Sequence, residues 1–184
     1  MGFAVECSQM KRIADLAGNT LTWVQEKALK RAYELRFSGE VVAGLRFEKA
    51  FGSLATAESV DGSWTFKREG FMKPRVTVRV EGSDANVAVF HQNLSGGGAI
   101  EFQDGRRYLW RCTSFWGSEW CFLTPEDHRV VQLKVNTSLF RNGAQVTVQT
   151  AVADVALLAM LGWYLMVLMA EDTAASTAAI MAGA

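Results

Sequence analysis

The stretch that decides the fold is VALLAMLGWYLMVLMA, residues 155–170, which contains sixteen residues and no charged side chain. Asp154 precedes it as a predicted helix N-cap, and the acidic pair 171–172 follows it. A helix of this length spans about 24 Å, whereas the hydrocarbon core of a bilayer is about 30 Å thick. Trp163 and Tyr164 lie mid-stretch, although membrane helices favour such residues at the interfaces. A helix that is apolar on all sides needs apolar surroundings, and we expect the chain itself to supply them.

The rest of the chain has the alternation of β-strands. Apolar and polar side chains alternate along 33–37, 75–80 and 130–135, and turn signals such as Asp61-Gly62 recur about every ten residues. About twelve short strands fit between residues 21 and 150. The sequence therefore predicts a mainly β protein, a closed antiparallel barrel of about twelve strands around the hydrophobic C-terminal helix. Such closure leaves no sheet edge exposed.

Three segments are expected along the chain. Residues 1–20 form an N-terminal helical segment, because Met10, Ile13 and Leu16 recur at helical spacing. Residues 21–170 form the barrel, with its central helix over 154–170. Residues 171–184, rich in Ala, Thr and Ser, form a flexible tail. Two alternatives for the helix remain open, a membrane anchor and a dimer interface.

Composition excludes several classes of protein. The chain has 184 residues, 19 basic and 19 acidic side chains and no net charge, which argues against a general nucleic-acid binder. Cys7, Cys112 and Cys121 form no CxxC motif and have no histidine at zinc spacing, so we expect no metal and no cofactor. Residues 1–6 lack the pattern of a signal peptide, and a cytoplasmic location is expected.

Two registers are open for the hairpin that contains the last two cysteines. A two-residue loop at 116–117 places Cys112 opposite Cys121, and a loop at 117–118 places Cys112 opposite Leu123. The first is favoured because it packs two small apolar thiols together in the core. Reduced, packed thiols are expected there, with a redox disulfide as the alternative.

Four segments, in order, resemble those of a known superfamily. They are YELRFSGEVVAGLRFEKAFGSLATAE (33–58), DGSWTFKREGF (61–71), GRRYLWRCTSFWGSEWCFL (105–123) and the terminal helix. In order and texture they resemble the tubby-like superfamily, which includes tubby C-terminal domains, LURP-one-related proteins and phospholipid scramblases. The resemblance covers residues 21–170 and implies a twelve-stranded barrel wrapped on a hydrophobic C-terminal helix.

The same resemblance implies no fixed activity. Tubby domains bind phosphoinositide head groups through basic residues on the barrel surface. Scramblases are associated with a calcium-binding acidic loop, but this chain has no D-x-[DN]-x-[DN]-G run, and Asp61, Asp84 and Asp104 stand apart.

The densest basic stretch is the candidate site for an anionic head group. Its residues are Lys67, Arg68, Lys73, Arg75 and Arg79. Each cation near a negative membrane contributes about 1 kcal/mol of attraction. The alternative is an ordinary solvated strand face. Arg106, Arg107 and Arg111 form a second, weaker candidate with the same alternative.

Residues 64–80, which contain all five basic side chains, are expected to form a hairpin in which the numbers of paired residues sum to 144. Lys67 and Arg79 then lie on the outward face, and Glu69 lies opposite Arg75, where it offsets one charge. Arg68 lies on the apolar face, so it must reach a barrel rim or find a partner.

These features predict a non-enzymatic binding module, cytoplasmic or peripheral on a membrane, that recognises anionic phospholipid head groups or a protein partner. One alternative is a scramblase-like membrane-integral protein with its C-terminal helix in lipid. Another is an enzyme with a site assembled from loop residues such as His91, His128, Asp104 or Ser95. No G-x-S-x-G elbow or phosphate-binding glycine loop supports the enzyme.

Overall fold

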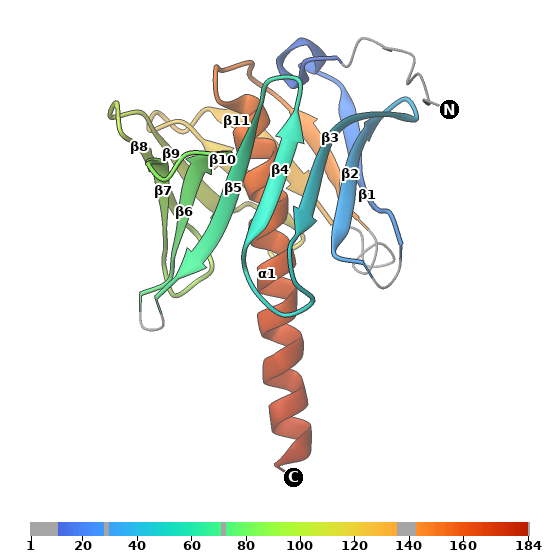
Figure 1. The fold of residues 1–184 in the computed structure, drawn as a ribbon, viewed down its shortest axis with the longest axis vertical. Coiled ribbons are helices and arrows are strands. Elements are labelled where there is room, and N and C mark those ends of the chain that lie inside the picture. Colours follow the sequence, from blue (N-terminus) through green and yellow to red (C-terminus); the bar gives the residue numbers. More distant parts are fainter. Residues whose placement is uncertain (1–10, 28–29, 71–72, 136–142, 184) are drawn as a thin grey trace.

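The computed structural model describes residues 11–27, 30–70, 73–135 and 143–183. Twelve strands and one long helix, α1 (Val155–Ala182), make up most of this part of the chain (Figure 1). The strands are β1 (Thr20–Gln25), β2 (Ala32–Phe37), β3 (Glu40–Phe47), β4 (Ala55–Ser59), β5 (Gly62–Glu69), β6 (Arg75–Val80), β7 (Asn86–Gln92), β8 (Gly98–Phe102), β9 (Arg107–Cys112), β10 (Glu119–Leu123), β11 (Arg129–Lys134) and β12 (Gln145–Val148).

The strands form one closed antiparallel barrel. Each pairs with its neighbours in sequence, and β12 closes the barrel against β1. The predicted fold is therefore confirmed: a mainly β barrel of twelve strands with an apolar helix at its C-terminus.

Because consecutive strands are antiparallel, the connections alternate between two ends of the barrel. α1 begins at the end that carries the connections after even-numbered strands, which we call the entry end (Figure 1). It runs through the barrel and leaves at the opposite end, which carries the connections after odd-numbered strands and which we call the exit end.

The barrel surrounds the apolar half of α1. Every residue from Val155 to Leu168 is buried. By length and composition α1 is apolar enough to cross a membrane, but 78% of its most apolar 18-residue window is buried inside the protein. Burial of each large apolar side chain contributes about 1.5–3 kcal/mol, so the lining of the barrel replaces the lipid that such a helix otherwise requires.

Two aromatic residues in the middle of α1 pack against the strands. The Trp163 ring stacks on Trp23, with ring centroids 6.1 Å apart, and meets Tyr33 edge-on at 5.4 Å. The Tyr164 ring stacks on Phe47 at 5.5 Å. A central position of Trp and Tyr is unusual for a membrane helix but fits a helix that packs against the inner face of a barrel.

α1 differs from the expected helix at both ends. The Asp154 side chain does not cap the helix; it accepts hydrogen bonds from Tyr108 Oη at 3.0 Å and from Arg106. Its backbone oxygen instead accepts the first helical bond, from Leu158 N at 2.9 Å. At the other end the helix continues past the expected boundary at 170, and the segment expected as a tail is helical as far as Ala182.

The N-terminal segment contains a shorter helix than expected. A single 3-10 turn, η1 (Ile13–Leu16), is present, and residues 1–10 of the expected helical segment lie outside the described residues. The Asp61 carboxylate accepts bonds from Arg12 Nε at 2.8 Å and from Ile13 N at 3.2 Å. Ile13 and Leu16 are buried in the core, so η1 covers part of the entry end.

Both expected registers for the cysteine hairpin are wrong. Cys112 pairs with Trp120, and Cys121 pairs with Arg111, so the two thiols lie on opposite faces of the sheet. Cys112 is exposed and Cys121 is buried. The cause is the turn. Thr113 N donates to the Glu119 backbone oxygen at 2.8 Å, so residues 114–118 form a loop longer than the expected two residues, and Gly117 adopts φ 72° within it.

We predict that Gly162→Leu destabilises the fold. A Cβ at Gly162 would lie 2.8 Å from Leu133 Cδ1 and 3.3 Å from Trp110 Cζ3, so a larger side chain overpacks the lumen. The free energy of unfolding in urea should fall by about 1–3 kcal/mol, although Leu has the better helix propensity. Ala175→Leu, on the exposed part of the same helix, is the control and should change stability little. Equal stability of both variants would contradict a tightly filled lumen.

The two described cysteines should differ in reactivity. Burial raises the pKa of the Cys121 thiol to about 11. In a Cys7→Ser background at pH 8, a thiol reagent should therefore modify Cys112 and spare Cys121 until the protein is unfolded or the pH approaches 11. Mass spectrometry after timed alkylation gives the readout. Fast labelling of Cys121 in the native protein at pH 8 would refute its burial.

Candidate functional site

The β5–β6 hairpin has the register expected from the sequence. Lys67 pairs with Thr77 and Glu69 with Arg75, which confirms the predicted sum of 144. The Arg75 guanidinium lies 3.5 Å from a Glu69 carboxylate oxygen, so this charge is offset as expected.

The five basic residues predicted as an anion site do not all lie together. Lys67, Arg68, Lys73 and Arg75 lie at or near the exit end. Arg79 lies further along β6 toward the entry end, where its Nε donates to an Asn86 side-chain oxygen at 2.8 Å.

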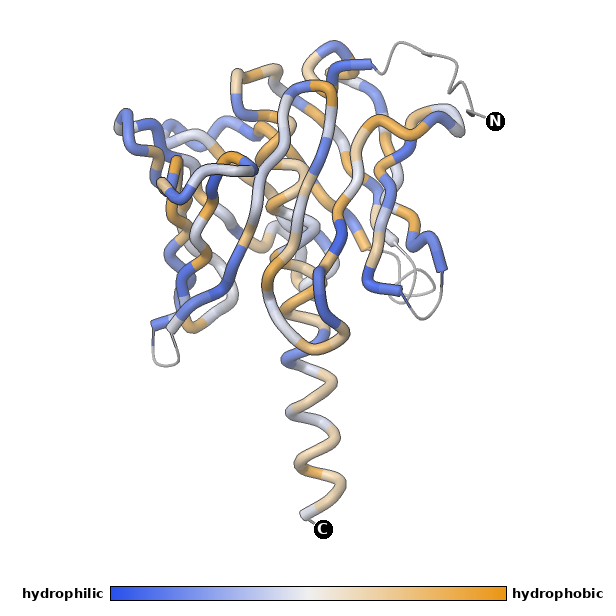
Figure 2. The backbone as a smooth tube through the Cα atoms, viewed as in Figure 1, coloured by the Kyte–Doolittle hydropathy of each residue, from blue (hydrophilic) through white to orange (hydrophobic). Residues whose placement is uncertain are grey.

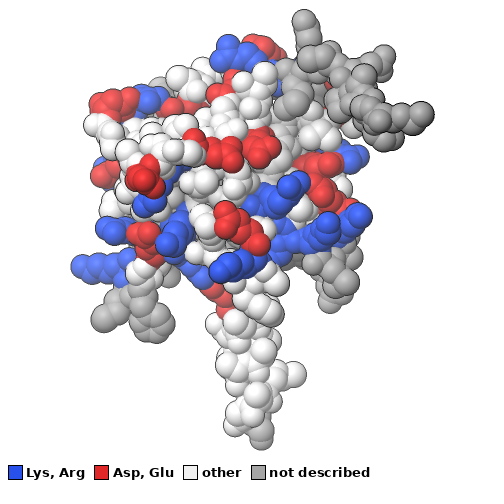
Figure 3. All heavy atoms as spheres, in the orientation of Figure 1, with Lys and Arg blue, Asp and Glu red and all other residues white. Residues whose placement is uncertain are grey.

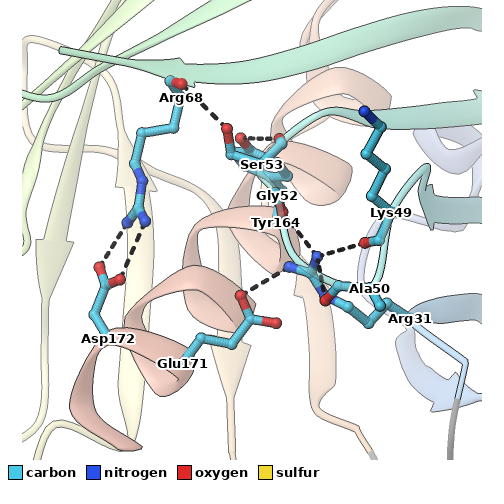
Figure 4. Close-up of polar contacts among 9 residues, drawn as sticks. All are labelled: Arg31, Lys49, Ala50, Gly52, Ser53, Arg68, Tyr164, Glu171 and Asp172. Carbon is cyan, nitrogen blue, oxygen red and sulfur yellow. Dashed lines mark hydrogen bonds and ion pairs between the residues drawn. The ribbon is translucent and has the colours of Figure 1, made fainter. Parts of the chain in front are cut away.

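Arg68 has found a partner on the helix. Its guanidinium forms two hydrogen bonds with Asp172 of α1, at 2.6 and 3.1 Å (Figure 4). These bonds outweigh burial and raise the pKa of Arg68 further. The expectation that Arg68 needs a rim position or a partner is therefore confirmed, and its main contact is structural.

Arg31, which the sequence analysis missed, holds the neighbouring side of the helix. Its guanidinium stacks on the Phe47 ring at 3.8 Å and donates to the backbone oxygens of Lys49 and Gly52 at 3.0 and 2.8 Å. It also donates to Glu171 at 2.7 Å (Figure 4). Arg31 thus ties the β3–β4 loop to α1 where the helix leaves the barrel.

One further contact completes this junction. Tyr164 Oη donates to the backbone oxygen of Ser53 in the same loop at 2.6 Å. Burial raises the pKa of Glu171, while the nearby Arg31 charge opposes that rise. The helix is therefore held by ion pairs to β5 and to the start of β2 at the barrel rim.

Several lysines at the exit end carry no such partner. Lys27, Lys30, Lys49 and Lys73 are exposed, and none forms an ion pair with a carboxylate in the described ranges. Figure 3 shows blue side chains gathered over the lower half of the barrel, above the projecting helix. These charges are available to an anionic ligand.

Large apolar side chains are exposed at the tips of the same loops. Phe51, Leu94, Phe115 and Trp116 are each at least 86% exposed. They come from the β3–β4, β7–β8 and β9–β10 loops, which all lie at the exit end. Together with Lys27, Lys30, Lys49, Lys67, Lys73 and Arg75 they form what we call the exit-end surface.

An apolar groove opens beside α1 at this end. It has a volume of about 670 Å³ and includes Tyr33, Trp120, Val135, Trp163, Met166 and Met169 in its lining. The groove adds apolar area next to the exposed loop tips.

The entry end has a different character. Its connections carry mainly acidic side chains: Asp15, Asp61, Glu81, Asp84, Asp104, Glu126, Asp127 and Asp154. Two basic side chains of the second candidate cluster are paired here, Arg106 with Asp104 and Asp154, and Arg107 with Glu101. The third, Arg111, lies further along β9 and pairs with Asp127. The two ends of the barrel are therefore electrically distinct.

The residues considered for an enzyme are not assembled into one site. His91 lies near the exit end of β7, whereas His128 lies in the β10–β11 connection at the entry end. Asp104 is paired with Arg106 at the entry end, and Ser95 lies in the β7–β8 loop at the exit end. Within the described residues no group of three His, Cys, Asp or Glu side chains is placed to hold a metal ion.

No family model, curated protein or solved structure matches the chain. The resemblance to the tubby-like superfamily therefore stays a prediction.

We predict that Arg31→Lys loosens the junction between the β3–β4 loop and α1. An ammonium group cannot stack on Phe47 while it donates to Lys49, Gly52 and Glu171, because it lacks the planar fork of a guanidinium. The free energy of unfolding should fall by about 1–3 kcal/mol, and limited proteolysis should cut the loop faster. Arg46→Lys, whose side chain is 76% exposed, is the control. A stability equal to that of the control would show that Arg31 does not hold the loop.

Proposed function

We propose that the protein is a non-catalytic binding module that docks on an anionic membrane surface through its exit-end surface. The observation that carries this proposal is that lysines without an ion-pair partner and exposed aromatic and aliphatic side chains lie at the same end of the barrel. Lysines near a negative surface contribute attraction, and apolar tips contribute burial in the interface between water and acyl chains.

The spacing of the lysines fits a membrane surface better than a small dissolved anion. A small anion needs convergent donors in a pocket, whereas Lys27, Lys30, Lys49 and Lys73 come from three connections spread around the rim. A bilayer presents an extended negative plane that can meet them all. The acidic entry end would face away from it.

The orientation also suits the exposed tips. Phe115 and Trp116 pack edge to face at 5.1 Å and project from one hairpin, and Trp favours the level of the lipid head groups. The alternative in which the whole C-terminal helix lies in lipid is less compatible with the enclosed stretch 155–168.

Binding to vesicles should depend on the exit-end lysines. Lys30→Glu/Lys49→Glu should weaken binding to phosphatidylserine-containing vesicles about thirtyfold or more, since each lost cation removes about 1 kcal/mol. Co-sedimentation at low and high salt gives the readout, and raised salt should weaken the wild type most.

The control carries the same charge change at the entry end. Lys11→Glu/Arg129→Glu should bind about as well as the wild type. If both double variants lose binding equally, net charge and not the exit-end surface is responsible. Absence of wild-type binding to anionic vesicles would refute the membrane proposal and favour a protein partner.

A further inference from the structure

The segment of α1 outside the barrel is the feature that membrane docking leaves unexplained. Residues 173–182 continue the helix beyond the exit end and contain no charged side chain (Figure 1). At 1.5 Å per residue this segment is about 15 Å long. Figure 2 shows the projecting end of the helix in pale and orange colours, without the deep blue of the charged residues.

The hydroxyl groups of this segment are already satisfied within the helix. Thr173 Oγ1 donates to the Met169 backbone oxygen at 2.8 Å, Ser176 Oγ to that of Asp172 at 2.8 Å, and Thr177 Oγ1 to that of Thr173 at 2.9 Å. A helix in hydrocarbon must satisfy its polar groups internally, and these bonds meet that condition for the side-chain hydroxyl groups before any contact with lipid.

The far part of the segment is apolar and exposed. Ile180 is 74% and Met181 is 79% exposed, although both belong to the residue types that are most often buried. The ion pairs of Glu171 and Asp172 lie between this apolar end and the enclosed part of the helix. The only acidic side chains of α1 are therefore neutralised at the rim and do not project beyond it.

The direction of the segment relates it to the proposed membrane surface. It points away from the barrel on the same side as the exit-end surface (Figure 1). If the lysines and apolar tips rest on a bilayer, the helix must extend into that bilayer. Half of a hydrocarbon core is about 15 Å thick, which matches the length of the segment.

We propose that residues 173–182 insert into one leaflet of the anionic bilayer as an axial anchor, with the barrel standing on the surface and its axis along the membrane normal. This inference rests on the proposed function. Residues 173–182 then lie among the acyl chains, and the paired carboxylates of Glu171 and Asp172 lie at the level of the lipid head groups. The barrel shields the first half of α1, and lipid shields its end.

A fluorescent label tests the anchor directly. Ala178→Cys in a Cys7→Ser/Cys112→Ser background carries the environment-sensitive dye NBD, and Ser83→Cys in the same background places the dye at the entry end as a control. On addition of phosphatidylserine-containing vesicles, NBD at position 178 should brighten and shift to the blue, and nitroxide-labelled acyl chains should quench it. NBD at position 83 should show neither effect.

Three other outcomes of this experiment would each contradict part of the proposal. Sedimentation of labelled protein with vesicles but no change of NBD at 178 would refute the anchor and leave the proposed function standing. No sedimentation would refute both. A blue shift that grows with protein concentration without vesicles would show that the segment packs against a second copy of the chain, which also overturns insertion.

A pair of substitutions provides an independent readout with unlabelled protein. Ile180→Asp should weaken vesicle binding at least tenfold, because a carboxylate would enter the acyl-chain region. Val60→Asp is the matched control, since Val60 is 51% exposed at the entry end. Equal binding by the two variants would contradict insertion of the helix end.

Discussion

The structure depends on the solvation of one apolar helix by the chain that contains it. A helix that is apolar all round cannot rest on the outside of a soluble sheet, because part of its surface would face water. A closed barrel is the arrangement in which strands with one apolar face surround it completely. The lumen of the barrel must in turn be filled, and the rings of Trp163 and Tyr164 fill part of it by stacking on Trp23 and Phe47 of the wall.

The polar contacts at the rim follow from the same constraint. Where α1 leaves the apolar lumen, the chain places Glu171 and Asp172, and each carboxylate meets a guanidinium from the barrel wall. At this level the carboxylates are partly exposed to water and paired, so the chain avoids the cost of burying an unpaired charge in the apolar lumen. The helix is consequently held in direction as well as in depth, and its projecting end has a defined angle to the barrel.

Periodicity in the sequence was sufficient to predict the strands, the barrel and the enclosed helix, because each depends on local alternation and on one long apolar run. The register of the β5–β6 hairpin followed from the same alternation. The cysteine hairpin did not, since its register depends on a longer loop, residues 114–118, that places Cys112 opposite Trp120. Arg31 was missed because its partner Glu171 is distant in sequence and the pair exists only once the barrel closes.

The exit-end surface could have been found from the sequence by a topological argument. In an up-and-down barrel, connections after odd-numbered strands share one end and those after even-numbered strands share the other. Sorting the loops by this parity separates the lysines at 27, 30, 49 and 73 from the aspartates at 61, 84 and 104. A search for dense basic stretches instead groups neighbours along one hairpin, which joined Arg79 to Lys73 although they belong to different ends. In a closed barrel the alternation of the loops, more than proximity in sequence, determines which side chains can meet one ligand.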